Sequence, residues 1–358
     1  MRPLLASASV AAIAATGLAL SACGDAPEDA PQAQSAPTTA RAELRPANDA
    51  NVRAASFRSD PDDTVDIVPD GVVSSVPDVP AEPVDLAVEI GAQPVPFEVW
   101  HELVMPGETI EISANAPISV RVDGRRVGDN ANTHEWTAPR TPGVHDMRVE
   151  GSDGVEHRVS VFVLQPYSGQ EVLDGYRIGT YPENAPEGFI RLGQDDMDTP
   201  VSPGFTIGQF ICKQQPGHWP KFLLVSGDML RRLEAVLTEL NEDGLTDADT
   251  FFVMSGYRTP FYNTEIRSAR LSRHMYGDAA DIYPDVEGND SVMDDLNNDG
   301  RITRADAEFL YDYAEDLFQR RADLPDGGIG AYDANAVHGP FVHIDGRGHR
   351  ARWGRYGS

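Results

Sequence analysis

Short runs in which apolar and polar residues alternate mark the chain between about residues 86 and 164. Glycine- and proline-containing turns separate these runs, which include 109–112, 119–122, 145–149 and 158–163. A period of two is typical of strands that bury one face. The pattern predicts an all-β, immunoglobulin-like sandwich at residues 85–166. Within this predicted sandwich, Trp136 is either a platform for a ligand or a packed core residue, and we favour the packed core residue.

From Phe205 onward the pattern of apolar residues predicts both helices and strands. One predicted helix, which Asp228 can cap, carries leucines on one face: Leu230, Leu233, Leu237 and Leu240. Residues 251–254 predict a buried strand, and further helices are expected near Asn263 and over about 304–321. We therefore expect an α+β domain with a small antiparallel sheet at 205–356, and we interpret the turn-rich residues 167–204 as a connector.

The first 84 residues show neither the two-residue period of strands nor the apolar period of helices. Residues 1–23 combine Arg2, an apolar run and small residues before a cysteine, which predicts an export signal. The end of this segment resembles the lipobox of bacterial lipoproteins, which implies lipidation at Cys23; the alternative is an ordinary secretory signal with an incidental cysteine. Residues 24–84 are rich in Ala, Pro, Asp and Ser and predict a disordered acidic tether. We expect an exported protein, lipid-anchored in the bacterial cell envelope and facing the periplasm.

Charge argues against nucleic-acid binding, and cysteine content argues against a disulfide framework. The formal net charge of −28 argues against nucleic-acid binding, which needs a basic face. The chain has only two cysteines. If Cys23 carries lipid, Cys212 has no partner for a disulfide, and its apolar neighbours predict a buried, inert thiol.

Two segments carry the residue types of a catalytic metal site. His274 and Asp281 lie in Ser-Arg-His-Met-Tyr-Gly-Asp-Ala-Ala-Asp-Ile (272–282), and His343 lies in Phe-Val-His-Ile-Asp (341–345). Two imidazoles and one carboxylate leave the fourth tetrahedral position of zinc open, as catalysis requires. The small residues within 277–280 would let the chain turn tightly enough for both ligands of the first segment to face one ion.

These segments, with Ser-Gly-Tyr-Arg at 255–258, resemble the D-Ala-D-Ala metallopeptidases. That family shares a zinc superfamily with lysostaphin-type peptidases and hedgehog amino-terminal domains. The similarity extends over about residues 205–353, includes Gly-Gly-Ile-Gly-Ala-Tyr at 327–332, and is nearest to exported murein endopeptidases and carboxypeptidases. It does not cover the predicted sandwich.

The resemblance implies a role for four residues. His274, Asp281 and His343 would be the zinc ligands. Arg258 would stabilise the tetrahedral oxyanion or hold a substrate carboxylate; the alternative for this arginine is a surface salt bridge.

The general base is the weakest part of the match. Related carboxypeptidases often have Glu three residues before the last ligand or His two before it, and here these positions hold Pro340 and Phe341. We predict Asp345 as the base, although it could equally orient a histidine through a hydrogen bond. His338 is a second candidate.

A further motif lies between the second and third predicted ligands. Residues 295–306 have the spacing of a twelve-residue calcium loop of the dockerin type, with Gly at position 6. The predicted ligands are Asp295, Asn297, Asp299, Arg301 (through its carbonyl), Thr303 and Asp306. The alternative is an Asx-rich turn that caps the following helix without metal.

The sequence supports three functional hypotheses. The first is an enzyme, a zinc metallopeptidase that cuts peptidoglycan stem peptides or cross-links during cell-wall remodelling. The second is a catalytically inactive, zinc-containing cell-wall-binding lipoprotein. The third is an adhesion or scaffold lipoprotein whose β-sandwich contacts the wall or a protein partner.

Overall fold

The computed structural model describes residues 86–152, 154–286 and 291–355. The predicted signal peptide with Cys23 and the predicted tether lie outside the described residues. The described residues, from Leu86 onward, belong to one compact unit. No helix in these ranges is long and apolar enough to cross a membrane.

Seven strands at the start of this part form one hydrogen-bonded set in the order β2-β1-β4-β6-β7-β3, with β5 paired to β4. They are β1 (Val88–Ile90), β2 (Gln93–Pro94), β3 (Val99–Val104), β4 (Thr109–Val122), β5 (Arg125–Thr137), β6 (Gly143–Gly151) and β7 (Glu156–Val163). β3 pairs with β7 in parallel, and the other neighbours are antiparallel. The ladders link all seven strands, so this region is rich in sheet, but the immunoglobulin-like sandwich is not confirmed.

Two strands differ from their sequence patterns. The runs 109–112 and 119–122 are parts of one strand, because register shifts after Ser113 carry β4 past Pro117 without ending its pairing with β5. β5 was not predicted, because most of its residues are exposed and show no apolar alternation.

Trp136 packs against the apolar core, which agrees with its interpretation as a packed core residue.

Short strands follow where a connector was expected. They are β8 (Gln165–Pro166), β9 (Val172–Leu173), β10 (Tyr176–Arg177), β11 (Gly188–Leu192), β12 (Pro200–Ser202), β13 (Phe205–Thr206) and β14 (Lys221–Leu223), with 3₁₀ turns η1 (Gln194–Asp196) and η2 (Ile207–Phe210). Tyr176, Phe189 and Leu192 are fully buried. These residues therefore contribute to the core, as a plain linker would not.

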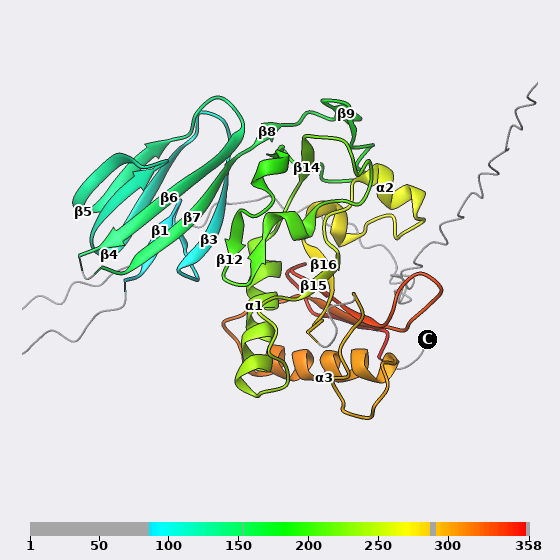
Figure 1. Ribbon diagram of the computed structural model, residues 1–358. Coiled ribbons are helices and arrows are strands. Elements are labelled where there is room, and N and C mark those ends of the chain that lie inside the picture. The colour runs from blue at the N-terminus through cyan, green and yellow to red at the C-terminus, as the bar shows by residue number, and fades with distance from the viewer. Residues whose placement is uncertain (1–85, 153, 287–290, 356–358) are drawn as a thin grey trace, which may run out of the picture. The chain divides into compact units, whose positions relative to one another are not determined.

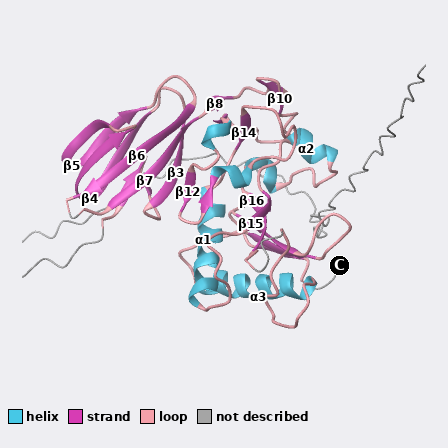
Figure 2. Ribbon diagram, in the orientation of Figure 1, coloured by secondary structure: helices cyan, strands magenta, loops and turns pink. Residues whose placement is uncertain are grey.

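The C-terminal part is built on a five-stranded sheet in the order β15-β16-β18-β17-β19 (Figure 1). Its strands are β15 (Phe252–Ser255), β16 (Ala279–Tyr283), β17 (Gly328–Tyr332), β18 (Phe341–Asp345) and β19 (Ala351–Trp353). The helical elements are α1 (Gly227–Glu242), α2 (Pro260–Glu265), the 3₁₀ turn η3 (Arg273–Tyr276) and α3 (Arg304–Arg320). α1 and α3 contact each other and β18. Figure 2 shows the same division, with strands alone at first and helices only later in the chain.

The helices agree with the leucine pattern to within a few residues. In α1 the predicted leucines, Leu230, Leu233, Leu237 and Leu240, are all buried. Its N-cap is Ser226 rather than Asp228, which lies in the first turn, where a negative charge interacts favourably with the helix dipole.

The two central strands of the C-terminal sheet separate polar from apolar residues. Ala280, Ile282, Val342 and Ile344 are fully buried. Because successive side chains of a strand point to opposite faces, Asp281 and His343 project from the other face. The apolar pattern that anchors the sheet to its core therefore also sets the side on which these polar residues lie.

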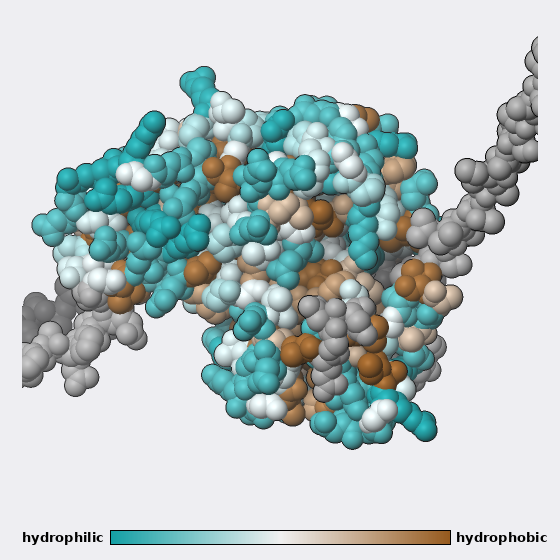
Figure 3. Space-filling view, viewed as in Figure 1, coloured by the Kyte–Doolittle hydropathy of each residue, from teal (hydrophilic) through white to brown (hydrophobic). Residues whose placement is uncertain are grey.

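The surface is mainly hydrophilic on the face shown in Figure 3, with small scattered apolar patches. Large apolar side chains are exposed at Val172, Val286, Val292, Ile302 and Val337. Scattered exposed residues of this kind are normal on soluble domains and need no further explanation.

Gly277 provides a test of the local fold. It has a positive φ of 67°, and a Cβ there would lie 2.3 Å from the backbone of Leu224. We expect Gly277→Ala to lower the free energy of unfolding by about 2–4 kcal/mol, the sum of left-handed strain and a steric clash. Gly244 also has a positive φ, 66°, but has open space around it, so Gly244→Ala should cost about 1 kcal/mol. Equal losses for the two variants in urea unfolding, with a chelator present, would contradict this account.

Candidate metal centre

His274, Asp281 and His343 form a buried cluster. Their exposed fractions are 1%, 2% and 6%, and their ligand atoms all lie within 4.8 Å of one another. In the described ranges this is the only such group of three His, Cys, Asp or Glu residues. The structure therefore brings together the three residues that the sequence predicts as zinc ligands.

The distances within this cluster match one small ion. His274 Nε2 lies 3.3 Å from Asp281 Oδ1 and 3.2 Å from His343 Nδ1, and the latter lies 2.9 Å from Asp281 Oδ1. A tetrahedral zinc with bonds of about 2.0–2.1 Å separates its donors by about 3.3 Å. The three donor atoms are thus spaced as a tetrahedral zinc requires.

Sheet register places two of the ligands. Asp281 in β16 and His343 in β18 are directly paired across antiparallel strands. Side chains at such positions have Cβ atoms about 4.5–5.5 Å apart, so both can reach one ion. His274 enters from η3, which Gly277 ends with its left-handed conformation.

Each histidine ring is held by its other nitrogen. His274 Nδ1–H donates to the carbonyl oxygen of Gly256 at 2.7 Å, which leaves Nε2 free to bind a metal. His343 Nε2 lies 3.1 Å from Asp345 Oδ2, which leaves Nδ1 for the same purpose. Metal-binding histidines usually have such a partner, which fixes the tautomer and the ring orientation.

Asp345 lies behind the ring of His343, next to the ring nitrogen that faces away from the cluster. Its carboxylate accepts from the backbone N–H of Gly328 and from the guanidinium of Arg347 as well as from His343. Burial alone would raise the pKa of Asp345, but His343 and Arg347 outweigh it and hold the pKa below its usual range. These contacts favour the second role that the sequence left open, in which Asp345 orients a histidine, and its role as general base stays a prediction.

Arg258 contacts a ligand rather than open space. Its Nη2 donates to Asp281 Oδ2 at 2.5 Å, and its other nitrogens donate to the hydroxyls of Ser255 and Ser268. Burial would raise the pKa of Asp281, but His274 and Arg258 hold it well below the usual range. Arg258 thus forms a buried ion pair that keeps Asp281 charged, and its contact with an oxyanion or a substrate carboxylate stays a prediction.

The other predicted base also lies apart from the cluster. His338 is in the loop before β18, with its ring nitrogens 2.6 Å from Asn335 Nδ2 and 2.7 Å from the carbonyl of Gly339. Pro340 and Phe341, at the usual base positions, have no side chain that accepts a proton. Phe341 instead stacks on Tyr332.

Sequence reasoning missed the aromatic neighbour of His343. The ring of Trp353 lies 5.1 Å from the His343 ring, and its indole N–H donates to Tyr332. This packing requires a glycine at position 330, because a Cβ there would lie 2.2 Å from the indole nitrogen. The Gly-x-Gly of 328–330 next to the last ligand was the available signal.

The predicted calcium loop shows local hydrogen bonds instead of a gathered ligand set. Asp295 accepts from the backbone N–H groups of Asp299 and Gly300, and Asp306 accepts from those of Asn297 and Thr303. Thr303 is the N-cap of α3 and forms a capping box with Asp306. These contacts are those of the Asx-rich turn, so the structure does not support calcium here.

The role of Asp345 can be tested through metal affinity. Asp345→Asn should weaken zinc binding roughly 10- to 100-fold, because the ring of His343 loses its charged partner. Competition against a chromophoric chelator measures this, with Asp333→Asn on an exposed loop as the matched control. Unchanged zinc affinity together with lost activity would instead return Asp345 to the role of a base.

Comparisons with known proteins point to one family. Residues 228–300 match the model described as Peptidase M15. The matched segment contains Arg258, His274 and Asp281, while His343 lies beyond it; it spans well under half of the chain.

Other comparisons add little. No curated protein matches this chain. A solved structure described as the Bacteroides ovatus mixed-linkage glucan utilization locus SGBP-B in complex with a mixed-linkage heptasaccharide matches at 17% identity, over 18% of this chain and 23% of that chain, with a TM-score of 0.14. A score this low defines no shared fold. The family match and the buried His–Asp–His cluster together support a zinc-dependent Peptidase M15 domain in the C-terminal part of this chain.

Proposed function

We propose that this chain hydrolyses peptide bonds in peptidoglycan stem peptides or cross-links, as a carboxypeptidase or an endopeptidase. The observation that carries the proposal is the buried cluster of His274, Asp281 and His343, whose first two members lie within the Peptidase M15 match. Three protein ligands leave one coordination position open, which is the arrangement of catalytic zinc sites.

The residues present fit zinc. Two imidazole nitrogens and a carboxylate oxygen are donors that zinc prefers, and both rings are oriented by partners on their far sides. When bound, zinc would supply a Lewis acid that polarises a peptide carbonyl and lowers the pKa of water.

The protein's own residues prepare this site. Arg258 keeps Asp281 ionised, so that a full negative charge offsets part of the charge of the ion. Asp345 and Gly256 fix the two histidine rings. Trp353 forms an apolar wall beside His343, which limits the access of bulk water to that side.

The substrate and location rest on the sequence. The similarity to exported murein peptidases supports peptidoglycan as the substrate. A lipidated Cys23 and a tether over residues 24–84 would hold the domain on a membrane of the cell envelope while it reaches the wall. Contact of the β-rich region with wall or protein is part of the same proposal.

A second function has specific support. Pro340 and Phe341 occupy the usual base positions, and Asp345 engages the far side of His343. A domain with intact ligands and no base at these positions would bind wall peptides through zinc without cutting them. This is the inactive cell-wall-binding lipoprotein.

Product release separates the two functions. We expect the zinc-loaded chain to release muropeptides from purified sacculi, and both His274→Ala and excess chelator to reduce release by at least about 10³-fold, because the ligand set is lost. Mass spectrometry of products from defined muropeptides identifies the bond that is cut. His134→Ala, in β5, is the control and should cleave the defined muropeptides at the unsubstituted rate, because soluble substrates do not depend on contact between the β-rich region and the wall. Zinc binding without release by the unsubstituted chain would support the non-catalytic function.

We also propose, from the sequence alone, that residues 295–306 take up calcium when it is supplied. Isothermal titration of the full chain should show one ion bound with a Kd of about 10⁻⁴–10⁻³ M, typical of extracellular modules. Asp295→Asn should abolish uptake, and Asp247→Asn at an exposed site should not. No heat of binding at millimolar calcium would leave the loop as a helix cap.

A further inference from the structure

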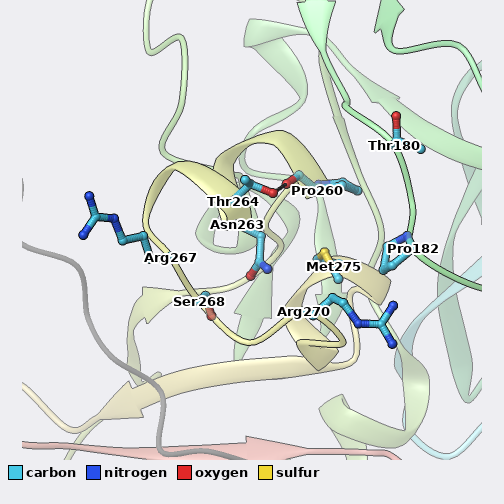
Figure 4. Close-up of a pocket in the computed structure, with 9 residues that line it drawn as sticks. All are labelled: Thr180, Pro182, Pro260, Asn263, Thr264, Arg267, Ser268, Arg270 and Met275. Atoms are coloured by element: carbon cyan, nitrogen blue, oxygen red, sulfur yellow. Dashed lines mark hydrogen bonds between the residues drawn. The ribbon is translucent and has the colours of Figure 1, made fainter.

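A pocket of about 410 Å³ opens beside α2. It lies among α2, the loop that leads from α2 to η3, and residues 180–182 (Figure 4). Its lining residues are Thr180, Pro182, Pro260, Asn263, Thr264, Arg267, Ser268, Arg270 and Met275. Most of the lining residues have polar side chains, and two prolines and a methionine complete the lining.

The pocket shares a wall with the supports of the metal ligands. Ser268 accepts a hydrogen bond from Arg258, and the same guanidinium donates to Asp281. Met275, which lines the pocket, directly follows the ligand His274. A peptide that lies across the metal centre could therefore continue into this pocket.

Asn263 offers an unused acceptor in the pocket. Its side chain is only 3% exposed, and its amide nitrogen donates to the carbonyl of Ala269. Its Oδ1 has no hydrogen-bond partner within the described ranges. A buried acceptor without a partner destabilises the folded protein, and an N–H group of a bound peptide would satisfy it.

Two arginines flank this acceptor. Figure 4 shows the side chains of Arg267 and Arg270 extending to opposite sides of Asn263 and Ser268. Arg270 pairs with Glu183 at 3.1 Å, but both side chains are largely exposed, so the pair is weak. The guanidinium of Arg267 makes no ion pair among the residues that the structure places.

Arg267 is held in an unusual backbone conformation. Its φ is 56°, in the left-handed region, at the end of α2 where glycine is common. An arginine there costs conformational energy that a glycine would not. Arg267 thus places a positive charge at a position where the backbone conformation favours glycine.

We propose that this pocket binds a carboxylate-rich segment of the peptide substrate, with Arg267 and Arg270 on its carboxylates and Asn263 Oδ1 on a backbone N–H. The inference rests on the proposed function and names the acidic part of the stem peptide as the determinant of recognition. The chain has 57 acidic and 29 basic residues, so two arginines beside one pocket provide local attraction on a protein that otherwise repels anions.

The test compares one peptide in two charge states. Calorimetry on the zinc-loaded full chain measures binding of L-Ala-γ-D-Glu-diaminopimelate with free carboxylates and with its side carboxylates amidated. Arg267→Gln and Arg270→Gln should each weaken binding of the acidic form about fivefold to tenfold, and the double variant more, because each removes a charge-assisted contact. Binding of the amidated form should change by less than about twofold.

The controls separate this inference from the proposed hydrolysis. Arg140→Gln, an exposed arginine before β6, makes the same charge change elsewhere and should leave both affinities unchanged. Sacculus hydrolysis by the unsubstituted chain, with equal binding of the acidic peptide by the double variant, would overturn the pocket and leave the function intact. If the double variant no longer distinguishes the acidic from the amidated peptide, and neither it nor the unsubstituted chain hydrolyses sacculi, the pocket is supported and the proposed hydrolysis is overturned.

Discussion

The antiparallel register of β16 against β18 is the constraint on which the metal centre depends. It pairs Asp281 with His343, and a shift by one residue would turn one strand's polar side chains toward the core. The alternate positions of both strands are apolar and fully buried: Ala280, Ile282, Val342 and Ile344. Because these residues must remain in the core, the pattern that folds the sheet also sets the positions of two ligands.

Buried charge gives the centre its second constraint. Arg258, Asp281, His343, Asp345 and Arg347 form a continuous series in which carboxylates alternate with cationic or hydrogen-donating groups. An unpaired buried charge costs several kcal/mol, so removal of one member leaves its neighbours uncompensated. The contacts that offset this cost also fix the ring and carboxylate orientations, so the site is organised before any ligand arrives.

The sequence predicted the elements better than their contacts. Residue type, spacing, strand context and the resemblance to D-Ala-D-Ala metallopeptidases together identified His274, Asp281 and His343, and the structure gathers them in one cluster. The two-residue spacing from His343 placed Asp345 on the same strand face, but spacing does not say which ring nitrogen a carboxylate meets. The ion pair of Arg258 with Asp281 was not foreseen for a similar reason, since the partner of an arginine depends on tertiary packing. β5 was missed because exposed strands lack the apolar period that reveals buried ones.

These contacts make metal binding and hydrolysis separable in this chain. The three ligands and the residues that orient them do not require a proton acceptor at Pro340, Phe341 or Asp345. Zinc content alone therefore does not indicate whether the chain is catalytic. If the chain hydrolyses peptides while Asp345 keeps these contacts, the proton from water must pass to an acceptor outside these three positions. Such an acceptor would have to lie on the open side of the cluster, opposite the contacts of His343 with Asp345 and of His274 with Gly256, because both far sides are already occupied.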